Sequence, residues 1–506
     1  MRTSLHPGPL PGARVDDSVT HISLTYLNRQ LIKANRTEAI APRFLLTLPK
    51  TETLVDLRDR INNSPMSFYQ WLIVGICTFL NALDGYDVLA ISFTSNQVTE
   101  EFQLSGTALG LVMSAALFGM AVGALVLGPV ADRIGRRNMM VLAIIVNAIG
   151  LFMSATAASA GQLGLWRIVT GLGIGGILVA TNVISAEYSS RKRRGLVISI
   201  YAAGYGIGAA LGGSVMVTLI ANFGWRSVFI LGGALAVFAL LLVLFMVPES
   251  ASFLYNRKPK GAQSKLESIG RRLGFNDPID LSAGDRLTAE DSGPGTGVLA
   301  LFNRSNRRVT LVVWTTFFII MFGFYFVNSW TPRLMHETGL TDTLSMIVTV
   351  GLTLGGAIGS VAFGLFTSRW STRSVLMTFS VVAAVLMAIF IFTAQWIAVV
   401  VVFGVMVGMS INGCIAGLYV LTPQSYSSTL RSTGAGWGIG IGRFGAIIAP
   451  TATGAMLDGG WSPQAIYIFV GAVLLLASLV LMGMRGVDVE ANKRPQVQRN
   501  ERVSAR

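Results

Sequence analysis

The chain has 506 residues, of which 52% are hydrophobic and only 13% are charged. Ordinary soluble domains carry about 25% charged residues. The shortage leaves long segments without any charge, which excludes an ordinary water-soluble domain and suits a lipid bilayer. The net charge of +14 suggests a nucleic-acid-binding protein at first sight, but the positions of the charges, described below, exclude that interpretation.

The chain begins with a polar segment, residues 1–65, that has no clear hydrophobic period, and we expect a largely disordered cytoplasmic tail. Within it, the stretch 54–61 is a candidate for a short interfacial helix. Twelve apolar runs follow, each about as long as the 20 residues that a helix needs to cross a bilayer. They cover 68–93, 108–130, 138–158, 163–186, 196–221, 227–247, 310–331, 344–367, 374–393, 396–421, 432–456 and 463–484.

These runs predict an all-α polytopic membrane protein with twelve transmembrane helices in two six-helix halves. The halves cover residues 66–247 and 310–485. A cytoplasmic loop at 248–309 joins them, and a cytoplasmic tail at 486–506 ends the chain.

The Lys and Arg residues support this division. Of the 39, 35 lie in the N-terminal tail, in the loops after even-numbered spans or in the C-terminal tail. The opposite side holds only Arg226 and Arg333, and two more, Arg167 and Arg443, lie within spans. Because cytoplasmic loops are enriched in Lys and Arg, both termini are predicted to be cytoplasmic, in the inner membrane. The charge therefore reflects topology, and no nucleic-acid partner is expected.

The two halves repeat each other. Gly128 in GPVADRIGRR recurs 236 positions later as Gly364 in GLFTSRWSTR, and Tyr188 recurs 238 positions later as Tyr426. Glycines at 204, 206 and 208 recur 234 positions later at 438, 440 and 442. Three matches in order at nearly one offset indicate a duplicated six-helix unit. Parallel repeats of this kind predict a binding site between the halves, near the membrane midplane.

The first span contains two aspartates, Asp84 and Asp87, in NALDGYDVLA, with Gly85 between them permitting close backbone approach. Charges inside a membrane are costly and are therefore functional candidates. A spacing of three places both carboxylates on one helix face, where they do not both ionise easily. One of them, preferably Asp84, is expected to hold the proton of a coupling site. In the alternative, Asp87 is solvated at the outer mouth or bonded to a neighbouring helix.

Two arginines complete the charges within the spans. Arg443 lies about midway along the glycine-rich eleventh span, and its planar guanidinium suits a carboxylate. It is the first candidate for binding an anionic substrate, with a structural ion pair as the alternative. Arg167 opens the fourth span near its outer end and is a second candidate for substrate binding. At that position it can equally snorkel or pair with an aspartate of the first span.

Aromatic and amide side chains near the midplane are candidates for lining a pocket that stacks on an aromatic ring. Most aromatic residues in membrane helices face lipid or pack between helices, which is the simpler interpretation of each one. The candidates are Tyr86, Tyr205, Phe324, Asn328, Tyr419 and Trp437, with Phe118, Tyr201, Tyr325 and Phe444 as further members.

The loop after the second span contains the most specific motif, GPVADRIGRR. Asp132 can pair with an arginine across helix ends and hold an inner gate shut, while Gly128 permits helix contact. We predict a conformational role for this motif, with Glu187 in the matching loop after the fourth span as a partner. The gating set is Gly128, Asp132, Arg133, Gly135, Arg136, Arg137 and Glu187.

Other motifs point to no enzyme. The sequence shows no Ser-His-Asp set, phosphate-binding loop or metal cluster, so neither a metal nor a cofactor is expected. GYGIGAALGG in the fifth span has no strand before it and is a helix-packing sequence. His336 lies in a predicted external loop, where a solvated residue is the simpler interpretation than a proton shuttle. Cys77 and Cys414 lie in apolar runs and are expected to be buried thiols.

Over about residues 52–490 the chain resembles the major facilitator superfamily. GPVADRIGRR is similar to the superfamily signature between helices 2 and 3, and VPES at 247–250 resembles another of its marks. ALDGYDVLAI resembles the helix 1 signature of the aromatic acid:proton symporters. The resemblance implies uptake of benzoate-like anions with a proton, coupled through Asp84 and Asp87. It also implies family arginines at Arg167 and Arg443.

We therefore expect a symporter that imports a small aromatic carboxylate with a proton, by alternating access across the bilayer. A proton-driven efflux pump for drugs or metabolites is an alternative with the same fold. A carrier for another small anion or a sugar is a second, and a non-transporting receptor, which the short tails disfavour, is a third. A monomer suffices for this architecture.

Overall fold

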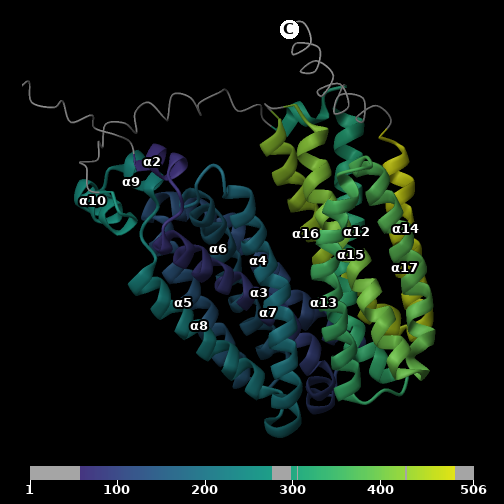
Figure 1. The fold of residues 1–506 in the computed structure, drawn as a ribbon. Helices are drawn as coiled ribbons and strands as arrows, with labels where there is room; N and C mark the ends of the chain where they lie inside the picture. The colour runs from purple at the N-terminus through teal and green to yellow at the C-terminus, as the bar shows by residue number, and fades with distance from the viewer. Residues whose placement is uncertain (1–56, 276–297, 305, 428–429, 485–506) are drawn as a thin grey trace, which may run out of the picture. The chain divides into compact units, whose positions relative to one another are not determined.

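The computed structural model describes residues 57–275, 298–304, 306–427 and 430–484, all within one unit of the chain. Residues 1–56 of the predicted N-terminal tail (1–65), the predicted C-terminal tail at 486–506 and part of the central loop lie outside these residues. Within the described ranges every regular element is a helix, as Figure 1 shows, and this confirms the all-α prediction.

Two sets of six long helices form the body of the protein (Figure 1). The N-terminal half comprises α3 (Phe68–Phe102), α4 (Gly106–Ile134), α5 (Arg136–Ala155), α6 (Ala160–Glu187), α7 (Arg194–Phe223) and α8 (Arg226–Met246). The C-terminal half comprises α12 (Arg307–Glu337), α13 (Asp342–Thr367), α14 (Thr372–Phe390) with the 3₁₀ turn η3 (Ile391–Gln395), α15 (Ile397–Ser425), α16 (Arg431–Asp458) and α17 (Pro463–Met482). Another 3₁₀ turn, η2 (Val298–Phe302), precedes α12.

The twelve predicted spans match these twelve long helices. Eleven of the described helices are long and apolar enough to cross a membrane. The twelfth, α16, is the glycine-rich helix that carries Arg443. Several helices run past the apolar segments, and α3 is the clearest case because its polar last two turns continue to Phe102. Ser or Thr side chains cap many of the N-termini, satisfying an otherwise unpaired backbone N–H. The capping residues are Ser67, Ser105, Ser159, Thr341, Ser371 and Ser462.

The two halves pack their helices in the same way, which supports the predicted duplication. In the N-terminal half α3 packs on α7 and α4 on α6, and α5 packs on both α6 and α8. In the C-terminal half α12 packs on α16, α13 on α15 and α14 on α17. Glycines permit the closest approaches. A Cβ atom at Gly85 would overlap the Tyr205 carbonyl oxygen, and one at Gly208 would overlap that of Ala82. Small residues thus bring α3 and α7 into backbone contact.

Three short helices lie at one end of the N-terminal half: α2 (Leu57–Asn63), α9 (Ala251–Arg257) and α10 (Ala262–Leu273) (Figure 1). The predicted interfacial helix at 54–61 overlaps α2, which packs on protein. Leu57 and Ile61 are buried, and the Leu57 amide donates to the Tyr255 hydroxyl at 3.0 Å. We call this end of the bundle the α10 side and the opposite end the far side.

The hydrogen bonds between the two halves gather toward the far side. The Ser92 hydroxyl donates to the Asn328 and Ser329 carbonyls, at 2.9 and 2.8 Å. The Asn96 amide donates to Asp342 at 2.5 Å. These contacts join the second half of α3 to the end of α12 and the start of α13, so the far-side ends of these helices are held together.

A second seam, which we call the α4–α16 seam, joins the two halves along those helices. The Asp458 carboxylate accepts from the amides of Gly106 and Thr107 at 2.6 and 2.8 Å. Here Gly106 and Gly454 are in backbone contact, because a Cβ on either would overlap the carbonyl of the other. Further along, the Ser114 hydroxyl bonds to Thr451 at 2.9 Å.

Candidate functional site

Asp87 and Arg167 form a buried ion pair between α3 and α6. The Arg167 guanidinium donates to both carboxylate oxygens of Asp87, at 2.5 and 2.9 Å, and to its carbonyl at 3.2 Å. The guanidinium also lies 5.7 Å from the ring centroid of Phe229. Arg167 is only 1% exposed. This is the pairing that the alternative interpretation predicted, and it leaves Arg167 unavailable to a substrate in this arrangement.

Asp84 is the aspartate without such a partner. It is buried, and its Oδ1 atom has no hydrogen-bond partner among the described residues. Its carboxyl interacts electrostatically with Arg443 of the other half and with Asp87, one turn along α3. Because Arg167 already neutralises Asp87, Asp84 is the group of the pair whose charge is not compensated at bonding distance.

Arg443 lies where the two halves meet. Its Nη1 donates to the Tyr325 hydroxyl at 3.2 Å and to the Met120 sulfur at 3.0 Å. Among the described residues no carboxylate lies within 4 Å of its guanidinium, although Asp84 acts on it at longer range. A cation held only by neutral groups retains the capacity to bind an anion.

Aromatic side chains surround Arg443. The ring of Phe324 contacts that of Tyr325 edge-on, at 5.1 Å between centroids, and that of Tyr205 at 6.3 Å. Tyr205, Tyr325 and Tyr419 all interact electrostatically with the guanidinium. The structure thus brings together residues from α3, α7, α12, α15 and α16 around one cation, and from α4 the methionine Met120.

Other predicted pocket residues lie elsewhere. Tyr86 is buried inside the N-terminal half, with its hydroxyl donating to the Val228 carbonyl at 2.7 Å. Asn328 donates within its own helix to Phe324 at 2.8 Å and lies at the α3–α12 contact. Trp437 stacks on Trp314 at 5.8 Å between centroids. A prediction from depth along a helix does not fix which face a residue occupies.

The further aromatic candidates divide in the same way. Tyr325 contacts Arg443, whereas Tyr201 bonds to Thr181 at 3.0 Å within the N-terminal half. Phe118 and Phe444 are half or more exposed on their helices. Exposed aromatic rings on membrane-crossing helices are typical of lipid-facing positions.

The predicted gating motif forms a polar cluster at the α10 side. Arg136 pairs with Glu187, and the Ser250 hydroxyl bonds to both, at 2.9 Å from Arg136 and 2.6 Å from Glu187. Asp132 lies 3.6 Å from Arg136, and Arg133 is exposed. These partners belong to the N-terminal half and to the start of the central loop, so here the cluster ties α4, α5, α6 and the start of α9 together.

The other three residues of the motif, Gly135, Arg137 and Gly128, make different contacts. Gly135 has a φ of 98° and lies against the Glu249 carboxylate, where a Cβ would overlap it. Glu249 in turn accepts from the Arg137 amide at 2.9 Å, while the Arg137 side chain donates to Leu244 at 2.6 Å. Gly128 was predicted to permit helix contact. In this structure a Cβ at Gly128 would meet the Val179 side chain at 3.9 Å, an ordinary van der Waals contact that does not require glycine.

Several functional contacts escaped the sequence prediction. Met120, Glu249 and Ser250 were not among the candidates, yet each bonds to a predicted residue. The VPES segment at 247–250 was the available signal for the last two, because it follows the sixth span on the side of the motif. Nothing in the sequence pattern distinguishes Met120 from other methionines of apolar helices.

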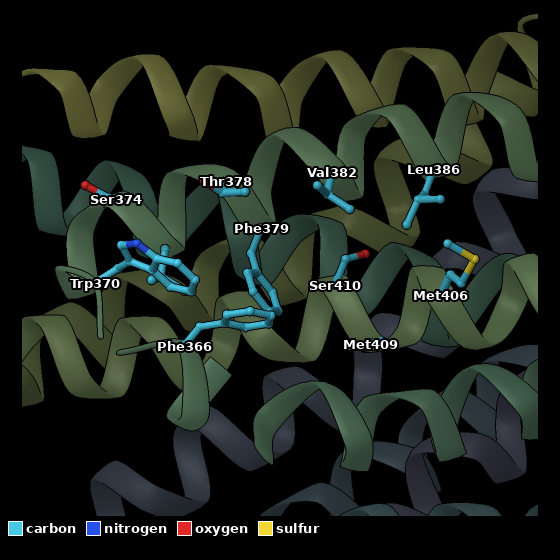
Figure 2. Close-up of a pocket in the computed structure, with 11 residues that line it drawn as sticks. Phe366, Trp370, Ser374, Thr378, Phe379, Val382, Leu386, Met406, Met409 and Ser410 are labelled. Carbon is cyan, nitrogen blue, oxygen red and sulfur yellow. The ribbon is translucent and has the colours of Figure 1, made fainter. Parts of the chain in front are cut away.

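A separate groove lies in the C-terminal half, shown in Figure 2. Its volume is about 550 Å³, and it is lined by Phe366, Trp370, Ser374, Val375, Thr378, Phe379, Val382, Leu386, Met406, Met409 and Ser410. The lining belongs to α13, α14, α15 and the turn after α13, and it contains no charged side chain. Nothing in it would compensate an anion, so the candidate site is the cluster around Arg443. Among the described residues no group of three His, Cys, Asp or Glu side chains offers a metal site.

Comparisons with known proteins agree with this architecture. The sequence model of the Major Facilitator Superfamily matches residues 74–341 and 313–505. The solved structure titled partially occluded inward-open xylose transporter XylE from E. coli has a TM-score of 0.67 at 18% identity. It matches over 83% of this chain and 98% of its own, which shows the shared fold.

The curated relatives have narrower names. A gallate transporter of Pseudomonas putida is 30% identical over 440 residues, which are 86% of this chain and 96% of the relative. The 4-hydroxybenzoate transporter PcaK of Pseudomonas aeruginosa is 31% identical over 443 residues, 87% of this chain and 98% of the relative. A benzoate transport protein of Acinetobacter baylyi is 26% identical over 416 residues, 80% of this chain and 87% of the relative. The chain therefore belongs to the Major Facilitator Superfamily of membrane transporters, and it is a transporter related to carriers of aromatic acids, not an enzyme.

Proposed function

We propose that this protein imports a small aromatic carboxylate together with a proton. The observation that carries the proposal is the relationship between Asp84 and Arg443. A buried carboxyl without a hydrogen-bond partner interacts electrostatically with a partly buried cation that has no carboxylate partner among the described residues. Relatives named for gallate, 4-hydroxybenzoate and benzoate support the substrate class. Tyr205, Phe324 and Tyr325 supply rings on which an aromatic substrate can stack.

The two groups provide a physical basis for coupling. When Asp84 is ionised, its negative charge partly compensates the positive charge of Arg443 and repels a second anion nearby. When Asp84 is protonated, Arg443 is left to bind the carboxylate of the substrate. Proton binding and anion binding therefore favour each other, and linkage makes this coupling reciprocal. When Asp84 loses its proton on the inner side, Arg443 binds the substrate anion more weakly, and the anion is released.

We also propose the orientation that the charges of the loops favour. The α10 side would face the cytoplasm and the far side the exterior, in the inner membrane, with both termini cytoplasmic. In this orientation the seams between the halves hold the outer side together, and Arg443 lies at their inner limit. A monomer contains every group that the scheme uses.

The test is uptake of labelled benzoate and 4-hydroxybenzoate by cells that express the protein, with and without a protonophore. The proposal expects accumulation that the protonophore collapses and that other benzoates, but not sugars, inhibit. Export of the same acids from energised cells would contradict import and show that the protein is an efflux carrier. Absence of any aromatic-acid flux from a well-expressed protein would remove the substrate class.

A further inference from the structure

Arg443 is held by one residue from each half. The Tyr325 hydroxyl belongs to α12 of its own half, whereas the Met120 sulfur belongs to α4 of the other. Met120 is 2% exposed and Arg443 is partly buried, so only the sulfur side of this contact is shielded from solvent. A thioether sulfur is a weak, uncharged acceptor. The N-terminal half therefore contributes to this cation an acceptor that is much poorer than a carboxylate.

The contact has a defined place in the α4–α16 seam. Starting at the far side, Asp458 caps the start of α4, Gly110 lies against Pro450, and Ser114 bonds to Thr451 and to the Ile447 carbonyl. Met120 and Arg443 come next, one to two turns further along both helices. Among the described residues theirs is the hydrogen bond of this seam nearest the α10 side.

The backbone of Met120 is packed against α6, whereas its side chain has several rotatable bonds. A Cβ at Gly171 of α6 would lie 2.8 Å from the Met120 amide nitrogen, and Gly175 is in contact with the Met120 carbonyl. α4 therefore cannot slide along α6 at this position without a clash. Met120 itself is unbranched with three rotatable bonds, so its sulfur can leave Arg443 by side-chain rotation alone.

We propose that Met120 occupies the anion position of Arg443 in the empty carrier and is displaced by the substrate carboxylate. This inference rests on the proposed function, in which Arg443 binds that carboxylate. A carboxylate forms charge-assisted, bidentate bonds with a guanidinium and outcompetes a thioether. Displacement also removes the innermost hydrogen bond of the seam. Substrate binding thus loosens the contact between the halves, and in the empty carrier Met120 restores it.

Met120 then has two measurable effects. Because it competes with the anion, its removal should tighten substrate binding. Because it holds the seam of the empty carrier together, and this seam must part before the unloaded protein can return, its removal should speed that return. Exchange of internal for external substrate omits that return, whereas net uptake includes it. A residue with only a packing role would lower both rates together.

The experiment uses the full-length protein in proteoliposomes with labelled 4-hydroxybenzoate. Met120→Leu keeps the apolar volume and removes the acceptor. Its apparent affinity should rise roughly three- to tenfold, the effect of losing one weak hydrogen bond, and its ratio of net uptake to exchange should rise. Met120→Gln supplies a stronger neutral acceptor and should lower the affinity. Met113→Leu, another methionine of α4 that is 2% exposed, is the matched control and should behave as wild type.

The results separate this inference from the proposed function. Equal affinity and an equal uptake-to-exchange ratio in wild type and Met120→Leu would overturn the role of Met120, as would identical changes in Met120→Leu and Met113→Leu. If Met120→Leu does not fold, an unchanged affinity in Met120→Gln would overturn it equally. A wild-type protein that neither binds nor exchanges aromatic acids would overturn the proposed function, and the inference with it.

Discussion

The guanidinium of Arg167 and the carboxylate of Asp87 neutralise each other inside the N-terminal half, at 2.5 and 2.9 Å, with almost no exposure to solvent. The pair joins α3 to α6 through two parallel hydrogen bonds. Its burial separates the roles of two aspartates only three residues apart. Asp87 stabilises the half in which it lies, whereas Asp84 keeps an oxygen without a hydrogen-bond partner and interacts electrostatically with Arg443.

Breaking the Asp87–Arg167 pair should destabilise the protein. Asp87→Asn or Arg167→Gln leaves one buried charge uncompensated, which typically costs about 3–5 kcal/mol. Replacing both residues together should restore part of that loss. The exposed pair of Arg226 with Glu101 is the control, because Arg226→Gln should cost less than about 1 kcal/mol. Thermal unfolding in detergent measures all four variants, and equal losses in the two pairs would contradict this assignment.

Asp84→Asn should uncouple transport from the proton gradient without lowering stability. The substitution removes a carboxyl that has an oxygen without a hydrogen-bond partner, so no ion pair is broken. Exchange of labelled substrate should continue and lose its pH dependence, whereas accumulation against a gradient should disappear. Uptake and exchange in the same proteoliposomes, at several external pH values, provide the measurement. Full accumulation by Asp84→Asn would end the coupling role of this residue.

Gly85→Ala should separate α3 from α7. The added methyl group would overlap the Tyr205 carbonyl, and overpacking of this kind costs about 1–3 kcal/mol. Gly75→Ala is the matched control on the same helix, because no atom lies within 4 Å of its Cβ position. It should be stabilising by about 0.5–1 kcal/mol, since alanine favours a helix over glycine. The two unfolding temperatures should therefore move in opposite directions, and parallel shifts would refute the packing argument.

Arg136→Ala should damage the polar cluster at the α10 side far more than Arg133→Ala. Arg136 is the ion-pair partner of Glu187 and donates to Ser250, and its loss leaves a largely buried carboxylate without a cation. Arg133 is exposed, and surface substitutions usually change stability by less than about 0.5 kcal/mol. Thermal unfolding and initial uptake rates compare the two variants. Similar behaviour of both would show that the cluster does not depend on Arg136.

The sequence was sufficient to predict the helices because uninterrupted apolar runs and the distribution of Lys and Arg report membrane crossing directly. The limits of α3 were less predictable, since its last turns are polar and bond to neighbouring helices. The duplication was also predictable, because three motifs recur at nearly one offset and the packing of the two halves follows a similar scheme.

The site was predictable only in part. Charged residues within apolar spans are recognisable from the sequence alone, which is why the candidates included Asp84, Asp87, Arg167 and Arg443. Their pairing was not, since spacing places both aspartates on one face and does not tell which of them meets Arg167. The contacts of the remaining candidates depend on how each helix is rotated about its own axis, which the sequence does not give. This rotation directs Tyr86 toward α8 and Tyr325 toward Arg443.

The far end of the α4–α16 seam has a consequence for the energetics of the transport cycle. Gly106 and Gly454 meet through their backbones, and the two hydrogen bonds that Asp458 accepts from amide groups are exposed. When these surfaces part, water can replace the protein partners in these bonds, so their loss costs little free energy. Joined and parted states of this interface can thus lie close in free energy. A carrier that must populate both in every cycle needs such a balance, which an interdigitated hydrophobic interface would not provide.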